Sequence, residues 1–162
     1  MASIEKDVEV DVPVRTAYDQ WTQFEQFPQF MEGVKSVRQV DDKRLEWHAE
    51  VLGKDVSWSA EITQQIPDQR ITWKSTSGAW NAGAVTFTPL SPTRTKVSLI
   101  LEYEPEGVVE NAASALGLVS ARVEGDLQRF KKFIEGRGLA TGQWRGEIHG
   151  QQVTTKSMEA GR

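Results

Sequence analysis

The sequence contains no cysteine, which excludes disulfide bonds, thiolate nucleophiles and cysteine-ligated metal centres. Its only histidines, His48 and His149, lie far apart in the chain and have no third histidine to complete a zinc site. A nucleophile elbow, a phosphate-binding P-loop and a dinucleotide-binding glycine motif are missing as well. We therefore expect no metal site and no cofactor.

Long apolar runs and concentrated positive charge are also missing. No segment approaches the ~20 apolar residues of a membrane-spanning helix, and the charged, alternating N-terminus does not resemble a secretory signal. The net charge is −4, and the densest basic segment, residues 129–133, fits a solvated helix face better than a phosphate-binding patch. We expect a cytoplasmic protein with no nucleic-acid partner and no transmembrane segment.

Alternation of apolar and polar residues is the main pattern that is present. With 162 residues the chain suits a single domain. Residues 4–12 alternate as a half-buried strand does, and further alternating runs occupy most of the chain from residue 34 to residue 103. Because the turns between these runs are of hairpin length, the pattern predicts an antiparallel sheet of about seven strands.

An aromatic segment follows the first strand. Rings recur at every third position from Tyr18 to Phe30, and this is helical spacing. Pro28 lacks a backbone N–H and disfavours helix at the residue before it. The segment therefore predicts a helix, a bend and a second short helix or turn, with its first rings in the core.

The end of the chain divides into a helix and a tail. Apolar residues spaced three and four apart predict an amphipathic helix over about residues 108–136, ended by Gly136 or Gly138. Residues 139–162 are polar and lack sustained periodicity. We therefore expect one domain over residues 1–138 and a loosely held, flexible tail after it.

The motif at residues 18–37, Y-x-x-W-x-x-F-E-x-F-P-x-F-M-x-G-V-x-x-V, and the order of elements resemble a known family. They are similar to the polyketide cyclase/dehydrase and coenzyme Q-binding group of the START-like, or SRPBCC, superfamily. The resemblance covers about residues 2–138. It implies an α+β helix-grip fold, in which a curved antiparallel sheet wraps around the long C-terminal helix and leaves a ligand cavity between them. It does not determine the activity, because the superfamily includes lipid carriers, quinone binders, cyclases and co-chaperones.

The residues themselves also indicate a container. By alternation, Trp47, Trp58 and Trp73 face the long helix, which carries Gly117 and Gly125. Large groups opposite small ones either interdigitate as a solid core or leave room for a ligand, and the resemblance favours the second. We expect the cavity to be lined by Trp47, Trp58, Ile62, Trp73, Phe87, Leu101, Tyr103, Leu116, Val123 and Leu127. We expect its entrance at Phe27, Phe30, Met31 and Trp80, although Trp80 also fits a subunit contact or a singly exposed ring.

Few polar groups are predicted to face this cavity. Gln64, Ser75 and Tyr103 can orient a carbonyl or hydroxyl group, but none is an obvious general base. The first hypothesis is therefore binding or transport of a hydrophobic small molecule such as a lipid, a quinone or an aromatic polyketide-like ligand. A polyketide cyclase or dehydrase of the aromatase type is the alternative, and a protein-interaction or co-chaperone-like module is the third.

Overall fold

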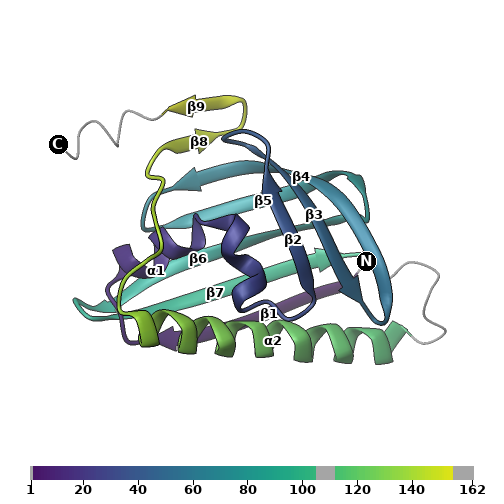
Figure 1. The fold of residues 1–162 in the computed structure, drawn as a ribbon, viewed down its shortest axis with the longest axis horizontal. Helices are drawn as coiled ribbons and strands as arrows, with labels where there is room; N and C mark the ends of the chain where they lie inside the picture. Colours follow the sequence, from purple (N-terminus) through teal and green to yellow (C-terminus); the bar gives the residue numbers. More distant parts are fainter. Residues whose placement is uncertain (1, 105–111, 155–162) are drawn as a thin grey trace.

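The computed structural model describes residues 2–104 and 112–154. Twelve elements follow one another in these residues, and Figure 1 shows their arrangement. They are β1 (Ala2–Val10), α1 (Val14–Trp21), the 3₁₀ helix η1 (Phe24–Gln29), β2 (Val34–Gln39), β3 (Arg44–Val51), β4 (Lys54–Ile66), β5 (Arg70–Gly78), β6 (Asn81–Ser91), β7 (Arg94–Tyr103), α2 (Ala112–Arg137), β8 (Glu147–His149) and β9 (Gln152–Thr154).

The strands form one curved antiparallel sheet of nine strands, with the order β1-β7-β6-β5-β4-β3-β2 in its main path. The helix α2 lies along the concave side of this sheet, and α1 and η1 lie on the same side (Figure 1). The predicted α+β helix-grip architecture is thus confirmed. The expected strand number is corrected from about seven to nine, because β8 and β9 come from the segment that was predicted to be a tail.

Proline residues define the helical pair at the N-terminal end, as the sequence predicted. Pro13 precedes α1, and its carbonyl accepts a hydrogen bond from Ala17 N at 3.1 Å. Pro28 lies inside the short helix η1, whose 3₁₀ turns tolerate the missing N–H. The two elements bring a chain of edge-to-face rings into the core, including Trp21 against Phe27 at 5.5 Å and Phe27 against Phe30 at 5.7 Å.

The long helix α2 ends where glycine allows a left-handed residue. Gly138 has φ +72°, and its N–H donates to the carbonyl of Ile134 at 2.8 Å. The apolar face of α2 carries the buried residues Val123, Leu127, Phe130 and Ile134, which pack toward the sheet and the aromatic core. The predicted start of this helix at residue 108 lies outside the described residues.

Residues 139–154 are not the loosely held tail that the sequence predicted. The strand β8 pairs with β4 at Gln64 and Gln65, just beyond Glu61, where the pairing of β4 with β3 ends. Ile148 on β8 is completely buried, and Trp144 packs against the core. Pairing with the edge of β4 and burial of Ile148 thus hold residues 139–154 against the sheet. Residues 155–162 lie outside the described part.

A buried ion cluster anchors the same segment. The guanidinium of Arg145 pairs with the carboxylate of Asp19 on α1 and lies 2.7 Å from the carboxylate of Asp68. It also lies over the ring of Tyr18, with its carbon 5.4 Å from the ring centre. The side chains of Arg145 and Asp19 are 11% and 8% exposed, so the charges compensate each other in a largely desolvated place.

Candidate functional site

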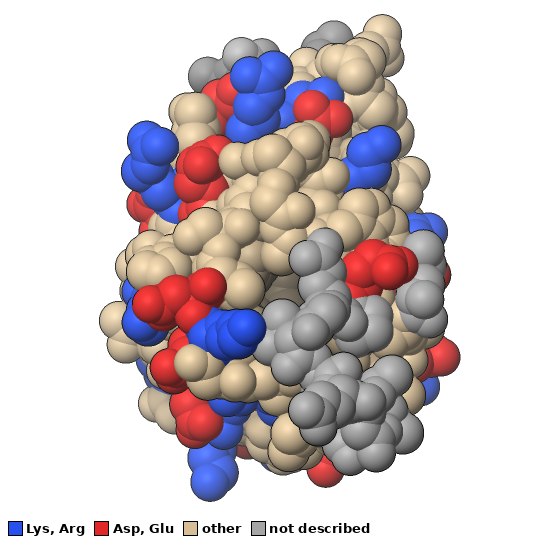
Figure 2. Space-filling view, turned by 90° about the vertical axis from the view of Figure 1, so that its right-hand side faces the viewer, with Lys and Arg blue, Asp and Glu red and all other residues tan. Residues whose placement is uncertain are grey.

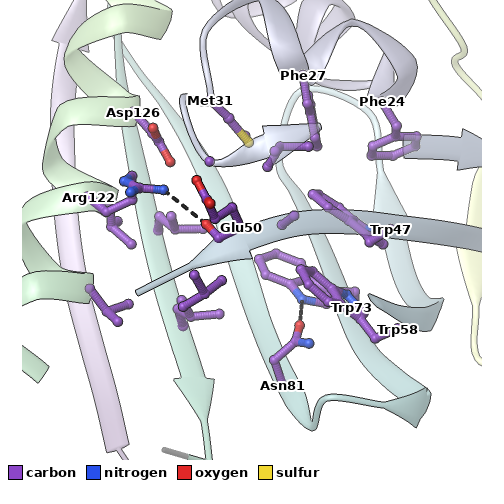
Figure 3. A pocket seen from close by; sticks show the side chains of 18 of the residues that line it. Phe24, Phe27, Met31, Trp47, Glu50, Trp58, Trp73, Asn81, Arg122 and Asp126 are labelled. Atoms are coloured by element: carbon purple, nitrogen blue, oxygen red, sulfur yellow. Dashed lines mark hydrogen bonds between the residues drawn. The ribbon is translucent and has the colours of Figure 1, made fainter. Parts of the chain in front are cut away.

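A cavity of about 480 Å³ lies between the sheet, η1 and α2. The strands β3, β4 and β5 supply indole rings, and η1 supplies Phe24 and Phe27. The helix α2 contributes Leu118, Val119 and further side chains on the opposite wall. Figure 3 shows the side chains converging on this space from the three sides. The volume is within the ~300–1,000 Å³ range of small-molecule sites.

Strand register determines how the tryptophans lie. Trp47 and Trp58 are directly opposite each other in the β3–β4 pairing, and their rings stack at 5.4 Å with 12° between their planes. Trp73 is fixed differently, because its Nε1 donates to Oδ1 of Asn81 at 3.1 Å (Figure 3). Its ring occupies the space beside Gly83, where a Cβ atom would come within 2.5 Å of it. The three indoles therefore form a wall with defined orientations.

The free space does not come from the helix glycines. A Cβ atom at Gly117 would meet nothing within 4 Å, and one at Gly125 would meet the guanidinium of Arg129 at 3.0 Å. Neither glycine lies against the tryptophans, so that part of the sequence argument is wrong. The cavity arises because two indoles stack on each other and the third lies against Gly83, while the described residues of the facing helix bring no aromatic ring to this wall.

Most of the predicted lining residues border the cavity. They are Trp47, Trp58, Ile62, Trp73, Leu101, Val123 and Leu127, together with Phe27 and Met31 of the predicted entrance. Strand alternation identified the inward residues of β3, β4 and β5, and helical spacing identified those of α2. The placement of these residues follows directly from the periodicity of each element.

Three residues of the predicted lining lie elsewhere. Phe87 faces inward, but the ring of Tyr18 from α1 covers it at 5.4 Å, so it belongs to the solid core. Tyr103 lies at the end of β7, opposite Ala2 and Asn81, outside the cavity wall. Leu116 is 36% exposed in the part of α2 that precedes the cavity wall.

Two residues of the predicted entrance are also placed elsewhere. Phe30 is 2% exposed and packs against Phe130 of α2 at 5.2 Å. Trp80 is half-buried in the turn between β5 and β6 and does not border the cavity. The predicted inward polar residue Ser75 accepts a hydrogen bond from Asn81 N at 3.0 Å and is outside the lining.

The opening lies between the tip of the β3–β4 hairpin and α2. Its rim contains the exposed residues Glu50, Val51, Gly53 and Leu118, and Leu118 is 60% exposed. Figure 2 shows a hollow on this side of the molecule, with uncharged side chains along its upper border. The sequence did not identify this rim, because a hairpin tip carries no periodic pattern.

Among the described residues, three ionisable side chains border the cavity, all at the end that opens between the hairpin and α2: Glu50, Arg122 and Asp126. A guanidinium N–H of Arg122 points at the backbone carbonyl of Glu50, at 3.4 Å (Figure 3). Asp126 accepts hydrogen bonds from Arg129 and from Glu32 N, the latter at 3.2 Å. Burial raises the pKa of the Asp126 carboxyl, and the hydrogen bond from Arg129 opposes this shift.

Sequence reasoning missed Arg122 and Asp126, although a signal was present. Both lie next to Val119, Val123 and Leu127 at helical spacing, on the edge of the apolar stripe of α2. Charged residues in such places are usually solvated, and their proximity to a cavity depends on how far the sheet curves. Only the assembled structure brings them to the opening.

The described residues contain no group of three or more metal-ligating side chains. His48 lies on the sheet surface, 3.8 Å from the carboxylate of Asp55, and His149 lies 3.0 Å from that of Glu147. Within residues 2–104 and 112–154, no helix has the length and apolar composition needed to span a membrane.

A curved antiparallel sheet that holds a long C-terminal helix across an internal cavity defines the helix-grip class of proteins. Within this class, the chain matches the family of polyketide cyclases/dehydrases and lipid transport proteins over residues 10–132. The chain belongs to this family. It is also 49% identical over 149 residues to an uncharacterized 17.2 kDa protein in the melC2–rnhH intergenic region of Streptomyces lincolnensis, covering 91% of this chain and 99% of that protein.

Solved structures show the same fold at lower sequence identity. A START superfamily protein from Mycobacterium smegmatis is 21% identical with a TM-score of 0.64, covering 83% of this chain and 95% of that one. The Zhui aromatase/cyclase from Streptomyces sp. R1128 is 15% identical with a TM-score of 0.72, covering 88% of this chain and 98% of that one. At these identities the likeness establishes the fold, and the resemblance inferred from residues 18–37 is confirmed.

Proposed function

We propose that the protein binds a hydrophobic, ring-bearing small molecule in the cavity between sheet and helix. The observation that carries the proposal is the tryptophan wall, in which Trp47, Trp58 and Trp73 border about 480 Å³ of space. A flat ligand gains about 0.5–1.5 kcal/mol for each favourable ring contact beyond the burial of its area. Lipids, quinones and aromatic polyketides all have enough apolar surface to profit from such a wall.

Binding without chemistry is supported by the polar groups at the tryptophan end. The amide of Asn81 is engaged on both sides, because Oδ1 accepts from Trp73 and Nδ2 donates to the carbonyl of Ala79 at 3.2 Å. A general base needs a free lone pair within hydrogen-bonding reach of the proton it removes. The described residues at this end offer no carboxylate or imidazole in that position.

One observation favours a cyclase or dehydrase as the second candidate. Asp126 borders the cavity, and its raised pKa makes a protonated carboxyl group available nearer to neutral pH than an ordinary aspartate. Such a group could protonate a leaving hydroxyl during dehydration of a polyketide. An Asp126→Asn variant separates the candidates, because it should abolish turnover of a poly-β-ketone mimic by an enzyme and leave ligand binding by a carrier intact.

Quenching of tryptophan fluorescence tests the first candidate. A bound naphthoquinone should quench emission saturably, after correction for its absorbance. Trp58→Phe, which breaks the indole stack, should weaken binding several-fold. Trp80→Phe is the matched control, because Trp80 does not border the cavity, and it should leave the affinity unchanged. If a panel of quinones, flavonoids and fatty acids gives no saturable quenching, the protein is not a carrier of this kind.

A further inference from the structure

The open end of the cavity has a different chemistry from the tryptophan end. Of the described residues on the cavity wall, Arg122 is the one with a permanent positive charge. The nearby carboxylate of Asp126 is already engaged by Arg129, whose Nε also donates to the carbonyl of Phe30 at 3.0 Å. Arg129 is thus the nearer counter-charge of Asp126, and the attraction from Arg122 is a smaller contribution.

Arg122 itself is weakly engaged. Its guanidinium carries five N–H donors, but its hydrogen bond to the Glu50 carbonyl is 3.4 Å long and its ion pair with Glu32 is 4.0 Å long. The Glu32 side chain is 66% exposed, and an exposed pair of this length contributes little. A competing anion can therefore replace Glu32 without breaking a buried contact.

The backbone also fits around this guanidinium. A Cβ atom at Gly33 would lie 1.9 Å from Nη1 of Arg122, so glycine leaves the space that the group occupies. Arg122 is 38% exposed and lies at the boundary between an apolar cavity and water. A neutral ligand that covered the guanidinium would remove the water that its N–H groups bind and offer no hydrogen bonds in return.

We propose that Arg122 selects amphipathic acids, with the ring body against the tryptophans and a carboxylate at the opening. A guanidinium binds a carboxylate through two parallel hydrogen bonds, which gives both affinity and orientation. This inference rests on the proposed function of the cavity as a ligand-binding site. It assigns the specificity for the charged end of the ligand to a residue outside the aromatic wall.

A pair of matched probes tests the proposal: 4-(1-pyrenyl)butyrate and its methyl ester, which share the ring body and differ in charge. Binding is measured by energy transfer from tryptophan to pyrene. The unchanged protein should bind the acid more tightly than the ester. Arg122→Gln should weaken binding of the acid about tenfold, which corresponds to about 1.4 kcal/mol, and change binding of the ester less than twofold.

Lys132→Gln is the control, because it removes the same charge from an exposed position of α2 that does not border the cavity. It should leave both affinities unchanged. Arg122→Lys should retain part of the preference for the acid, because it keeps the charge and loses the planar fork.

The outcomes separate the two proposals. If Arg122→Gln binds both probes as the unchanged protein does, the role of Arg122 is refuted and the cavity function stands. A preference of the unchanged protein for the ester also refutes it, and this result does not depend on whether any variant folds. If the unchanged protein binds neither probe saturably but binds the naphthoquinone, the role of Arg122 is refuted and the cavity function stands. If it binds none of these compounds, the proposed function of the cavity itself fails.

Discussion

Replacing Ile148 by alanine removes the apolar contact that holds β8 against the sheet. Ile148 is completely buried and lies opposite Gln65 in the β4–β8 pairing. Truncation of a buried isoleucine costs about 2–5 kcal/mol when the surroundings cannot collapse. A domain of this size is stable by about 5–15 kcal/mol, so the loss should be a large fraction of the total.

Urea unfolding followed by far-UV circular dichroism gives the measurement. With a slope of about 1–3 kcal/mol per M, the unfolding midpoint should fall by about 1–2 M. Val153→Ala on β9 is the control, because Val153 is 37% exposed, and it should change stability by less than about 0.5 kcal/mol. An Ile148→Ala protein as stable as the control would mean that β8 contributes nothing, and residues 139–154 would be the loose tail after all.

Three further predictions concern other parts of the molecule. Arg145→Ala leaves the buried carboxylate of Asp19 with only its longer ion pair to the exposed Arg15, at 3.7 Å, and should cost about 3–5 kcal/mol in thermal or urea unfolding. A neutral result would show that the Arg145 cluster does not stabilise the fold. Burial raises the pKa of both Tyr18 and Tyr103 above the ordinary 10.0. The contribution of these two tyrosines to the free energy of unfolding is therefore fully present below pH 10. It should fall above pH 10, because the tyrosines of the unfolded chain ionise first. Tyrosinate absorbance at 295 nm should rise at higher pH in the folded protein than in a urea-unfolded sample, and coincident titration curves would contradict this. Gly83→Ala places a Cβ atom 2.5 Å from the ring of Trp73 and should cost about 1–3 kcal/mol with a shift in indole emission; an unshifted spectrum means that the ring is not held there.

The main sheet and the long helix were predictable because their apolar patterns persist over many residues. Strand β4, from Lys54 to Ile66, and helix α2, from Ala112 to Arg137, each repeat their period several times. Strand β8 has three residues, which is too short for any period to be recognised. Its docking depends on the edge of β4 beyond Glu61, which β3 leaves unpaired.

Strand alternation predicted which side chains face the concave side of the sheet. This identified the site correctly only where an inward-facing side chain also borders the cavity. Trp58 and Phe87 both face the concave side of the sheet, but only Trp58 borders the cavity. The ring of Tyr18 covers Phe87, because α1 fills that end of the concave side. Alternation along a strand reports the face of a side chain and carries no information on what covers that face.

The two ends of the cavity differ in how firmly their side chains are held, and this difference indicates how selection would divide between them. The stack of Trp47 on Trp58 and the hydrogen bond from Trp73 to Asn81 fix the rings of the tryptophan end, so a ligand bound as proposed would be selected there for its shape. The open end is bordered by a hairpin tip in which Leu52 and Gly53 have positive φ values of 54° and 82°, and by an arginine with long, exposed contacts. Groups held in this way can exchange their partners at small cost. A ligand bound as we propose would therefore be selected for shape at one end and for charge at the other.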